Sequence, residues 1–154
     1  MRNLLLFFCL ALVTVSSCKK SDGYNYEKQM QKDEELIKEF LTKNNLTAQR
    51  HEYGVYYIKS NPGTGNVVYT TNTNVTANYT LRLLNGTVVQ KTTEPVTFSL
   101  STVIKGWQIG IPLIQRGGKI RLLIPSVWAY GSVDQPGIPA NSVLDFDIEL
   151  VDVY

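Results

Sequence analysis

The sequence is poor in the residues that supply most catalytic and metal-binding chemistry. Its 154 residues include two cysteines, Cys9 and Cys18, and one histidine, His51. If an N-terminal signal is removed, as argued below, Cys9 leaves with it and Cys18 has no partner for a disulfide. A single histidine without a cysteine partner does not make a zinc site, so we interpret His51 as a solvated linker residue. We therefore expect no metal, no cofactor and no thiol chemistry in the folded part of the chain.

An excess of charge of one sign is also absent. The formal net charge is +2, and no basic stripe marks a surface for nucleic acid. Hydrophobic residues make up 44% of the chain and charged residues 18%, proportions that allow a buried core and exclude a disordered tail. The length accommodates one domain, a targeting segment and a small appendage.

The sequence also lacks an apolar run long enough for a transmembrane anchor, which needs about 20 apolar residues. Its start is instead typical of an export signal, because Arg2 is positively charged, residues 4–13 are apolar and small residues precede Cys18. Residues 1–17 are therefore predicted to be a signal peptide.

The end of this segment, Val15-Ser16-Ser17-Cys18, resembles a bacterial lipoprotein box, in which the cysteine is acylated and becomes the new N-terminus. Two or three acyl chains on Cys18 would give stable anchoring. We expect an exported protein anchored in the bacterial cell envelope through lipid on Cys18, at the periplasmic or surface face of the outer membrane, with residues 18–25 as a polar tether. The alternative is an ordinary cleaved signal with an incidental cysteine.

Residues 26–44 are predicted to form an amphipathic helix. Met30, Ile37 and Leu41 recur along one face, and Asn44-Asn45 supplies a stop. Such a helix can pack on the domain or pair with a second copy of the chain. We assign residues 26–52 to this helix and a linker, and residues 53–154 to a single domain.

Alternation of apolar and polar residues predicts strands in the domain, at residues 55–58, 75–83, 96–100, 119–124 and 144–150. Asn85-Gly86 predicts a hairpin that returns along residues 87–91. A short helix is expected from Ile104 to Ile111, where Pro112 should end it. One short helix against an antiparallel sheet is an α+β architecture.

The last strand has the clearest pattern. Leu144 and every second residue after it are apolar and predicted to face the core. The intervening acidic residues, which are Asp145, Asp147 and Glu149, are expected to face the other way.

The same region contains a series of distinctive blocks: Val103-Ile104-Lys105-Gly106-Trp107, Gly117-Gly118-Lys119, Trp128-Ala129-Tyr130-Gly131, Pro136-Gly137-Ile138-Pro139 and Phe146-Asp147-Ile148-Glu149-Leu150. In this order they resemble the FK506-binding protein (FKBP) family of peptidyl-prolyl cis/trans isomerases, over residues 55–154. The resemblance implies a curved antiparallel sheet wrapped around a short helix, with the active pocket between them.

The resemblance also implies the walls of that pocket. Trp107 would be the floor on which a proline ring sits, with Val103, Ile104 and Phe146 as apolar walls and Tyr79 beside them. For Trp107 and Phe146 the alternative is a purely structural place in the core.

Two hydrogen-bond donors and a flap are implied in the same way. Tyr130 would donate its hydroxyl to the carbonyl of the bound peptide, and Ile104 its backbone N–H. Ile138 would contact the substrate from a flap over residues 136–139. For Tyr130 the alternative is a loop tyrosine stacked on its neighbours.

The sequence departs from the family pattern at four substrate-facing positions. Val89 and Gln90 stand where an aromatic residue and an aspartate are usual, Val96 where another pocket phenylalanine is common, and Gln135 in place of the flap's frequent aromatic residue or histidine. Gln90 can hydrogen-bond but carries no charge. We expect a wider pocket, reduced activity, weak binding of macrolides of the FK506 kind and a changed preference at the residue before proline.

The function expected from this resemblance is isomerisation of X-Pro bonds in exported, proline-containing polypeptides. Rotation about the bond breaks amide resonance, against a barrier of about 18 to 20 kcal/mol, and makes no new bond, so neither metal nor cofactor is required. The alternative is a non-catalytic binding or chaperone module of an envelope or gliding-motility assembly that keeps the fold and holds partners in its groove.

Overall fold

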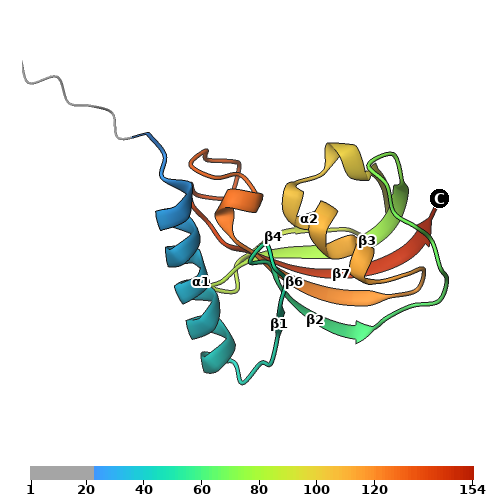
Figure 1. Ribbon diagram of the computed structural model, residues 1–154, viewed down its shortest axis with the longest axis horizontal. Coiled ribbons are helices and arrows are strands. Elements are labelled where there is room, and N and C mark those ends of the chain that lie inside the picture. The colour runs from blue at the N-terminus through green and yellow to red at the C-terminus, as the bar shows by residue number, and fades with distance from the viewer. Residues whose placement is uncertain (1–22) are drawn as a thin grey trace, which may run out of the picture.

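The computed structural model describes residues 23–154 and contains one seven-stranded antiparallel sheet (Figure 1). The predicted signal peptide and Cys18 lie outside the described residues. The strands are β1 (Gln49–Arg50), β2 (Tyr56–Asn61), β3 (Asn74–Leu83), β4 (Val88–Lys91), β5 (Val96–Ser99), β6 (Lys119–Ile124) and β7 (Leu144–Val153). Their order is β1-β2-β6-β7-β3-β4, with β5 also paired to β3. The sheet therefore begins at Gln49, ahead of the domain boundary expected at residue 53.

The two long strands, β3 and β7, pair along almost their whole length, from Val75 opposite Val153 to Leu83 opposite Leu144. On the other edge of β3, β5 pairs with residues 74–77 and β4 with residues 80–82. The predicted hairpin joins β3 to β4. Gly86, with φ +89°, donates its N–H to the Leu83 carbonyl, a tight turn that favours glycine.

Helix α2 (Lys105–Gly110) lies against one face of this sheet (Figure 1). Gly106 and Gly110 face β6 so closely that a β-carbon on Gly106 would lie 2.3 Å from Ile124 Cγ2, and one on Gly110 would lie 2.5 Å from Leu122 Cδ1. The main core fills the space between the helix and the sheet. Its deepest members include Ile111, Leu122, Ile124, Leu144 and Leu150.

The α-helix ends just before Pro112, as predicted, although a helical turn continues past it. The α-helix ends at Gly110, but a 3-10 turn, η2 (Ile111–Leu113), continues through the proline. A proline is tolerated at the start of a helical turn because its missing N–H has no intrahelical acceptor there.

The predicted N-terminal helix is α1 (Tyr26–Lys43), and it packs on the domain. Asn25 caps its start by accepting from the Lys28 N–H at 2.9 Å. Ile37 and Leu41 form a second, smaller core with Tyr56, Leu123 and Val143. No helix in the described part of the chain is long and apolar enough to cross a membrane.

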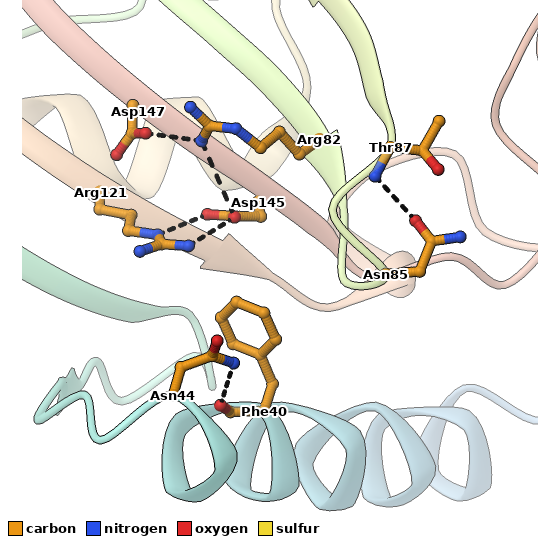
Figure 2. A network of polar contacts seen from close by, with 8 residues as sticks. All are labelled: Phe40, Asn44, Arg82, Asn85, Thr87, Arg121, Asp145 and Asp147. Carbon is orange, nitrogen blue, oxygen red and sulfur yellow. Dashed lines mark hydrogen bonds and ion pairs between the residues drawn. The ribbon is translucent and has the colours of Figure 1, made fainter.

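Asp145, one of the acidic residues of β7, is buried and only 1% exposed. Arg121 on β6 donates to both carboxylate oxygens, at 2.8 and 2.7 Å, and Arg82 donates to the neighbouring Asp147 at 2.6 Å (Figure 2). The hydrogen bond to Asp145 raises the pKa of Arg121 above its ordinary value. The Arg121 guanidinium also lies 5.5 Å from the centre of the Phe40 ring of α1. The helix thus covers the end of the sheet where these charges lie.

Substitution of Gly106 by Ala tests the close approach of α2 to β6. We expect Gly106→Ala to lower the free energy of unfolding by about 1 to 3 kcal/mol, the usual result of overpacking. Gly23→Ala, where a β-carbon meets nothing within 4 Å, should change it by less than about 0.5 kcal/mol. Urea denaturation measures both. At an exposed position in a helix, replacing glycine by alanine raises stability because alanine has the higher helix propensity. An increase in the free energy of unfolding for Gly106→Ala would therefore contradict this close packing.

Candidate functional site

A cavity of about 260 Å³ opens between α2, strands β3, β5 and β7 and the loop that follows β6. The main core lies beneath it, since several of its lining residues also pack there. The cavity is lined by Tyr79, Leu81, Gln90, Phe98, Thr102, Val103, Ile104, Trp107, Tyr130 and Phe146.

Trp107 is the central side chain of the cavity. Its indole is surrounded by three aromatic rings from three strands, Tyr79 at 5.3 Å and Phe98 and Phe146 at 5.5 Å between ring centres. All three pairs meet edge to face, the arrangement that the ring quadrupoles favour. The residue is only 3% exposed, and its indole N–H has no hydrogen-bond acceptor within residues 23–154. Trp107 is thus held rigidly and presents an apolar surface.

Tyr79 is fixed through its backbone. Thr92, which follows β4, donates its N–H to the Tyr79 carbonyl and accepts from the Tyr79 N–H, both at 3.0 Å. Burial raises the pKa of the Tyr79 hydroxyl above its ordinary value, and nearby Tyr130 raises it further. A side-chain hydrogen bond with Gln90 acts in the opposite sense. Tyr79 is therefore a neutral hydroxyl at physiological pH.

Ile104 lies immediately before α2 in extended conformation, with φ −57° and ψ 151°. Its carbonyl accepts from the N–H groups of Trp107 and Gln108, whereas its own N–H has no acceptor in the described structure. The preceding carbonyl, of Val103, accepts from the Gln108 side chain at 2.9 Å. The Ile104 N–H is consequently a backbone donor at this wall that remains available to a ligand.

Tyr130 reaches the cavity from the loop after β6, which begins with a 3-10 turn, η3 (Ser126–Trp128). The carbonyl of Ser126 accepts from the N–H groups on both sides of the tyrosine, Ala129 at 2.9 Å and Gly131 at 2.8 Å. The Gly131 carbonyl in turn accepts from Asn141 at 2.7 Å. The backbone around Tyr130 is therefore held, while the residue itself remains 37% exposed.

The structure brings most of the residues nominated from the sequence to one cavity: Tyr79, Gln90, Val103, Ile104, Trp107, Tyr130 and Phe146. Val89 and Ile138 are not in its lining. Ile138 is buried in the main core, and Val89 packs against that core and lies close to Gly137 of the expected flap. His51, expected to be solvated, is half-buried with its ring stacked on Tyr53.

The interpretation of Val96 as the wall position requires correction. Val96 is 41% exposed and does not line the cavity, whereas Phe98, two residues further along β5, does. Residues two apart in a strand point to the same face, so alternation favoured both equally. The aromatic ring that the sequence appeared to lack is therefore supplied by Phe98, which sequence reasoning missed together with Leu81 and Thr102.

The residues that line the cavity carry no formal charge, and their polar groups are hydroxyls, one amide side chain, the Trp107 indole N–H and backbone. A larger hollow, of about 460 Å³, lies across the sheet and includes Arg121, Asp147 and Glu149. Those charged groups pair with one another or with their neighbours. Residues 23–154 contain no group of three or more side chains suited to a metal ion. The smaller cavity thus suits an apolar ring flanked by peptide groups.

Comparison with known proteins gives a consistent assignment. The sequence pattern of the FKBP-type peptidyl-prolyl cis-trans isomerase family matches residues 66–151. The FKBP-type peptidyl-prolyl cis-trans isomerase FkpA of Buchnera aphidicola from Schizaphis graminum is 45% identical over 103 residues, which cover 65% of this chain and 41% of the relative. FkpA of Escherichia coli K12 is 55% identical over 60 residues, covering 39% of this chain and 22% of the relative. The chain thus spans less than half the length of these curated relatives.

Two solved structures have a similar fold. The crystal structure of Escherichia coli FkpA superimposes with a TM-score of 0.71 at 36% identity, covering 82% of this chain and 62% of that one. A peptidyl-prolyl cis-trans isomerase from Pseudomonas syringae superimposes with a TM-score of 0.70 at 29% identity, covering 84% of this chain and 96% of that one. The predicted α+β fold, a curved antiparallel sheet around a short helix, is confirmed.

Paired substitutions in β5 test which side chain forms the wall. We expect Phe98→Ala to lower the free energy of unfolding by about 3 kcal/mol, since it removes a ring packed on Trp107. Val96→Ala, on the same face of the same strand, should change it by less than about 0.5 kcal/mol. Urea denaturation followed by circular dichroism compares the two. Equal decreases in the free energy of unfolding would mean that both side chains form the wall of the cavity, and would contradict the assignment to Phe98 alone.

Proposed function

This chain belongs to the FKBP-type peptidyl-prolyl cis-trans isomerase family, and from that premise we propose that it accelerates cis/trans isomerisation of X-Pro bonds in polypeptides. The observation that carries the proposal is the position of Trp107, edge to face with three rings at the base of an uncharged cavity. A proline ring placed on this indole would bring its preceding amide bond among apolar walls.

Isomerisation of an X-Pro bond requires an apolar environment around the amide, and it requires no nucleophile, acid or base. The planar amide is more polar than the twisted one, so water stabilises the ground state against a barrier of about 18 to 20 kcal/mol. A cavity that excludes water and accepts the twisted amide more readily lowers that barrier. Val103, Ile104 and Phe146 supply this apolar surface, and burial keeps the Tyr79 hydroxyl neutral beside it.

Two donors are proposed to orient the peptide. The Tyr130 hydroxyl, on a partly exposed residue at the cavity, would donate to a substrate carbonyl. The Ile104 N–H, which lacks an internal acceptor, would donate to a second one. Val89 and Ile138 would contribute to substrate binding through the flap over residues 136–139, because Val89 lies close to Gly137.

Gln90 is proposed to reduce the rate and to weaken the binding of macrolides of the FK506 kind. Its amide shares the cavity lining with Tyr79 and acts to lower the pKa of the Tyr79 hydroxyl, but it lacks the charge of the aspartate that is usual at this position in the family. Charge-assisted hydrogen bonds are roughly twice as strong as neutral ones. The tyrosine is therefore held less firmly than a charged partner would hold it, although Phe98 supplies an aromatic wall.

The substrates are proposed to be exported proteins. Uncatalysed X-Pro isomerisation takes tens to hundreds of seconds and limits folding, so an isomerase held at the cell envelope would serve newly exported chains. The support for export, and for a lipid anchor at Cys18, comes from the sequence of residues 1–18 alone.

The function is tested by NMR exchange between the cis and trans forms of short X-Pro peptides, with residues 19–154 added and the residue before proline varied. Wild type should enhance the exchange, and Trp107→Phe should reduce the enhancement because a smaller ring no longer fills the base of the cavity. Tyr154→Phe, which alters an exposed ring outside the lining, is the control and should leave the enhancement unchanged. No enhancement by folded wild type across the panel would refute the proposal.

The role of Gln90 is tested by Gln90→Asp. We expect the variant to exceed wild-type activity by about threefold, since a carboxylate accepts a stronger hydrogen bond. The gain should appear only above the pKa of the new carboxyl, ordinarily about 4, because its protonated form carries no charge. Wild-type activity should stay constant between about pH 5 and pH 8, because the lining contains no carboxyl, imidazole or amine side chain. A gain that is independent of pH, or no gain, would contradict this role.

A further inference from the structure

We propose that Asp33, on the N-terminal helix, is a positioning residue for Tyr130. The two residues belong to different parts of the fold, α1 and the loop after β6, and Asp33 does not line the cavity. The inference rests on the proposed function, because it assigns Asp33 to the orientation of the hydroxyl that would bind the peptide carbonyl.

The first step is the contact between helix and loop. Asp33 is fully buried, and its Oδ2 accepts two hydrogen bonds from Ser126, one from the backbone N–H and one from the hydroxyl, both at 2.7 Å. Gln29, one turn earlier in α1, donates to the other carboxylate oxygen at 2.8 Å. A carboxylate this deep, accepting three hydrogen bonds, fixes the position of Ser126 closely.

The second step leads from Ser126 to the tyrosine. Ser126 is the first residue of η3, and its N–H belongs to the groups that find no acceptor within a helical turn. Asp33 therefore acts as a cap supplied from another element. The carbonyl of the same Ser126 accepts from Ala129 and Gly131, which flank Tyr130. Asp33, Ser126 and the two neighbours of Tyr130 form one continuous chain of hydrogen bonds.

A second hydrogen bond joins the N-terminal region to the loop that carries Tyr130. The Trp128 indole N–H donates to the Tyr53 carbonyl at 2.6 Å, and Tyr53 lies in the segment between α1 and β2. Tyr24, just before α1, lies about 3.8 Å from where a β-carbon on Gly131 would be. The N-terminal region thus contacts the Tyr130 loop at several points, and Asp33 provides the buried one.

The control for this inference comes from the same helix. Ile37 is as deeply buried as Asp33 and packs with Leu123 and Tyr56, but it takes no part in the hydrogen bonds that hold Ser126. Ile37→Ala loosens the helix without removing the cap, whereas Asp33→Ala removes the cap. If Asp33 acts only by holding the helix on the domain, the two variants should reduce isomerisation equally.

The test is a double-mutant cycle read by peptide exchange NMR at a temperature where every variant is folded. Tyr130→Phe should lower the exchange rate by about three- to tenfold, the effect of one neutral hydrogen bond. Asp33→Ala should give a similar loss, with no further loss in the Tyr130→Phe background. Ile37→Ala leaves the hydrogen bonds between Asp33 and Ser126 in place, so its exchange rate should remain within about twofold of wild type, a barrier change of less than about 0.5 kcal/mol. Additive losses, or equal losses for Asp33→Ala and Ile37→Ala, would overturn the proposal.

A conservative substitution of Asp33 and the NMR signals of the Tyr130 loop provide two further tests of its positioning role. Asp33→Asn retains a carbonyl acceptor for the Ser126 N–H and should restore part of the rate, while an Asn variant no better than Ala would count against the cap. If wild type shows no exchange enhancement, the proposed function fails, and the inference is then decided by the NMR signals of the Tyr130 ring and the Gly131 amide. Asp33→Ala should shift both and Ile37→Ala neither, and unchanged signals in Asp33→Ala would refute it.

Discussion

The site depends on how closely α2 approaches the sheet. Gly106 and Gly110 leave no room for side chains between the helix and β6, so the helix backbone rests on Ile124 and Leu122. At this distance the Trp107 indole lies among rings from three strands and becomes the base of a cavity. A larger residue at either glycine would move the helix away from the sheet and separate the rings. The residues that pack the helix on the sheet therefore also shape the cavity.

Charged side chains are kept out of the cavity and are buried elsewhere in the fold. The cavity lining carries none, whereas two carboxylates are buried elsewhere, Asp145 beside Arg121 and Asp33 beside Ser126. Each accepts several hydrogen bonds, as a buried carboxylate must if its desolvation is to be offset. Both lie where α1 meets the domain, so the N-terminal helix is joined to the fold by polar contacts as well as by the second core.

Much of the fold was predictable because its patterns are local. The helix at residues 26–43, the long strands β3 and β7 and the turn at Gly86 follow from periodicity and turn chemistry, and the structure confirms them. One site assignment required correction for a physical reason. Val96 shares a strand face with Phe98, so alternation alone was unable to select the residue nearer to α2.

The sequence by itself determined the periodicities, the turn positions and the ordered blocks that carry the family resemblance, since these depend on neighbouring residues. It also supplied seven of the residues that line the cavity, through that resemblance. Tertiary structure alone decided that α1 packs on the domain, that Phe98 forms the wall and that Asp33 meets Ser126, 93 positions away. Such contacts join residues that lie far apart along the chain, and no pattern of neighbouring residues predicts them. They form only when the whole core packs.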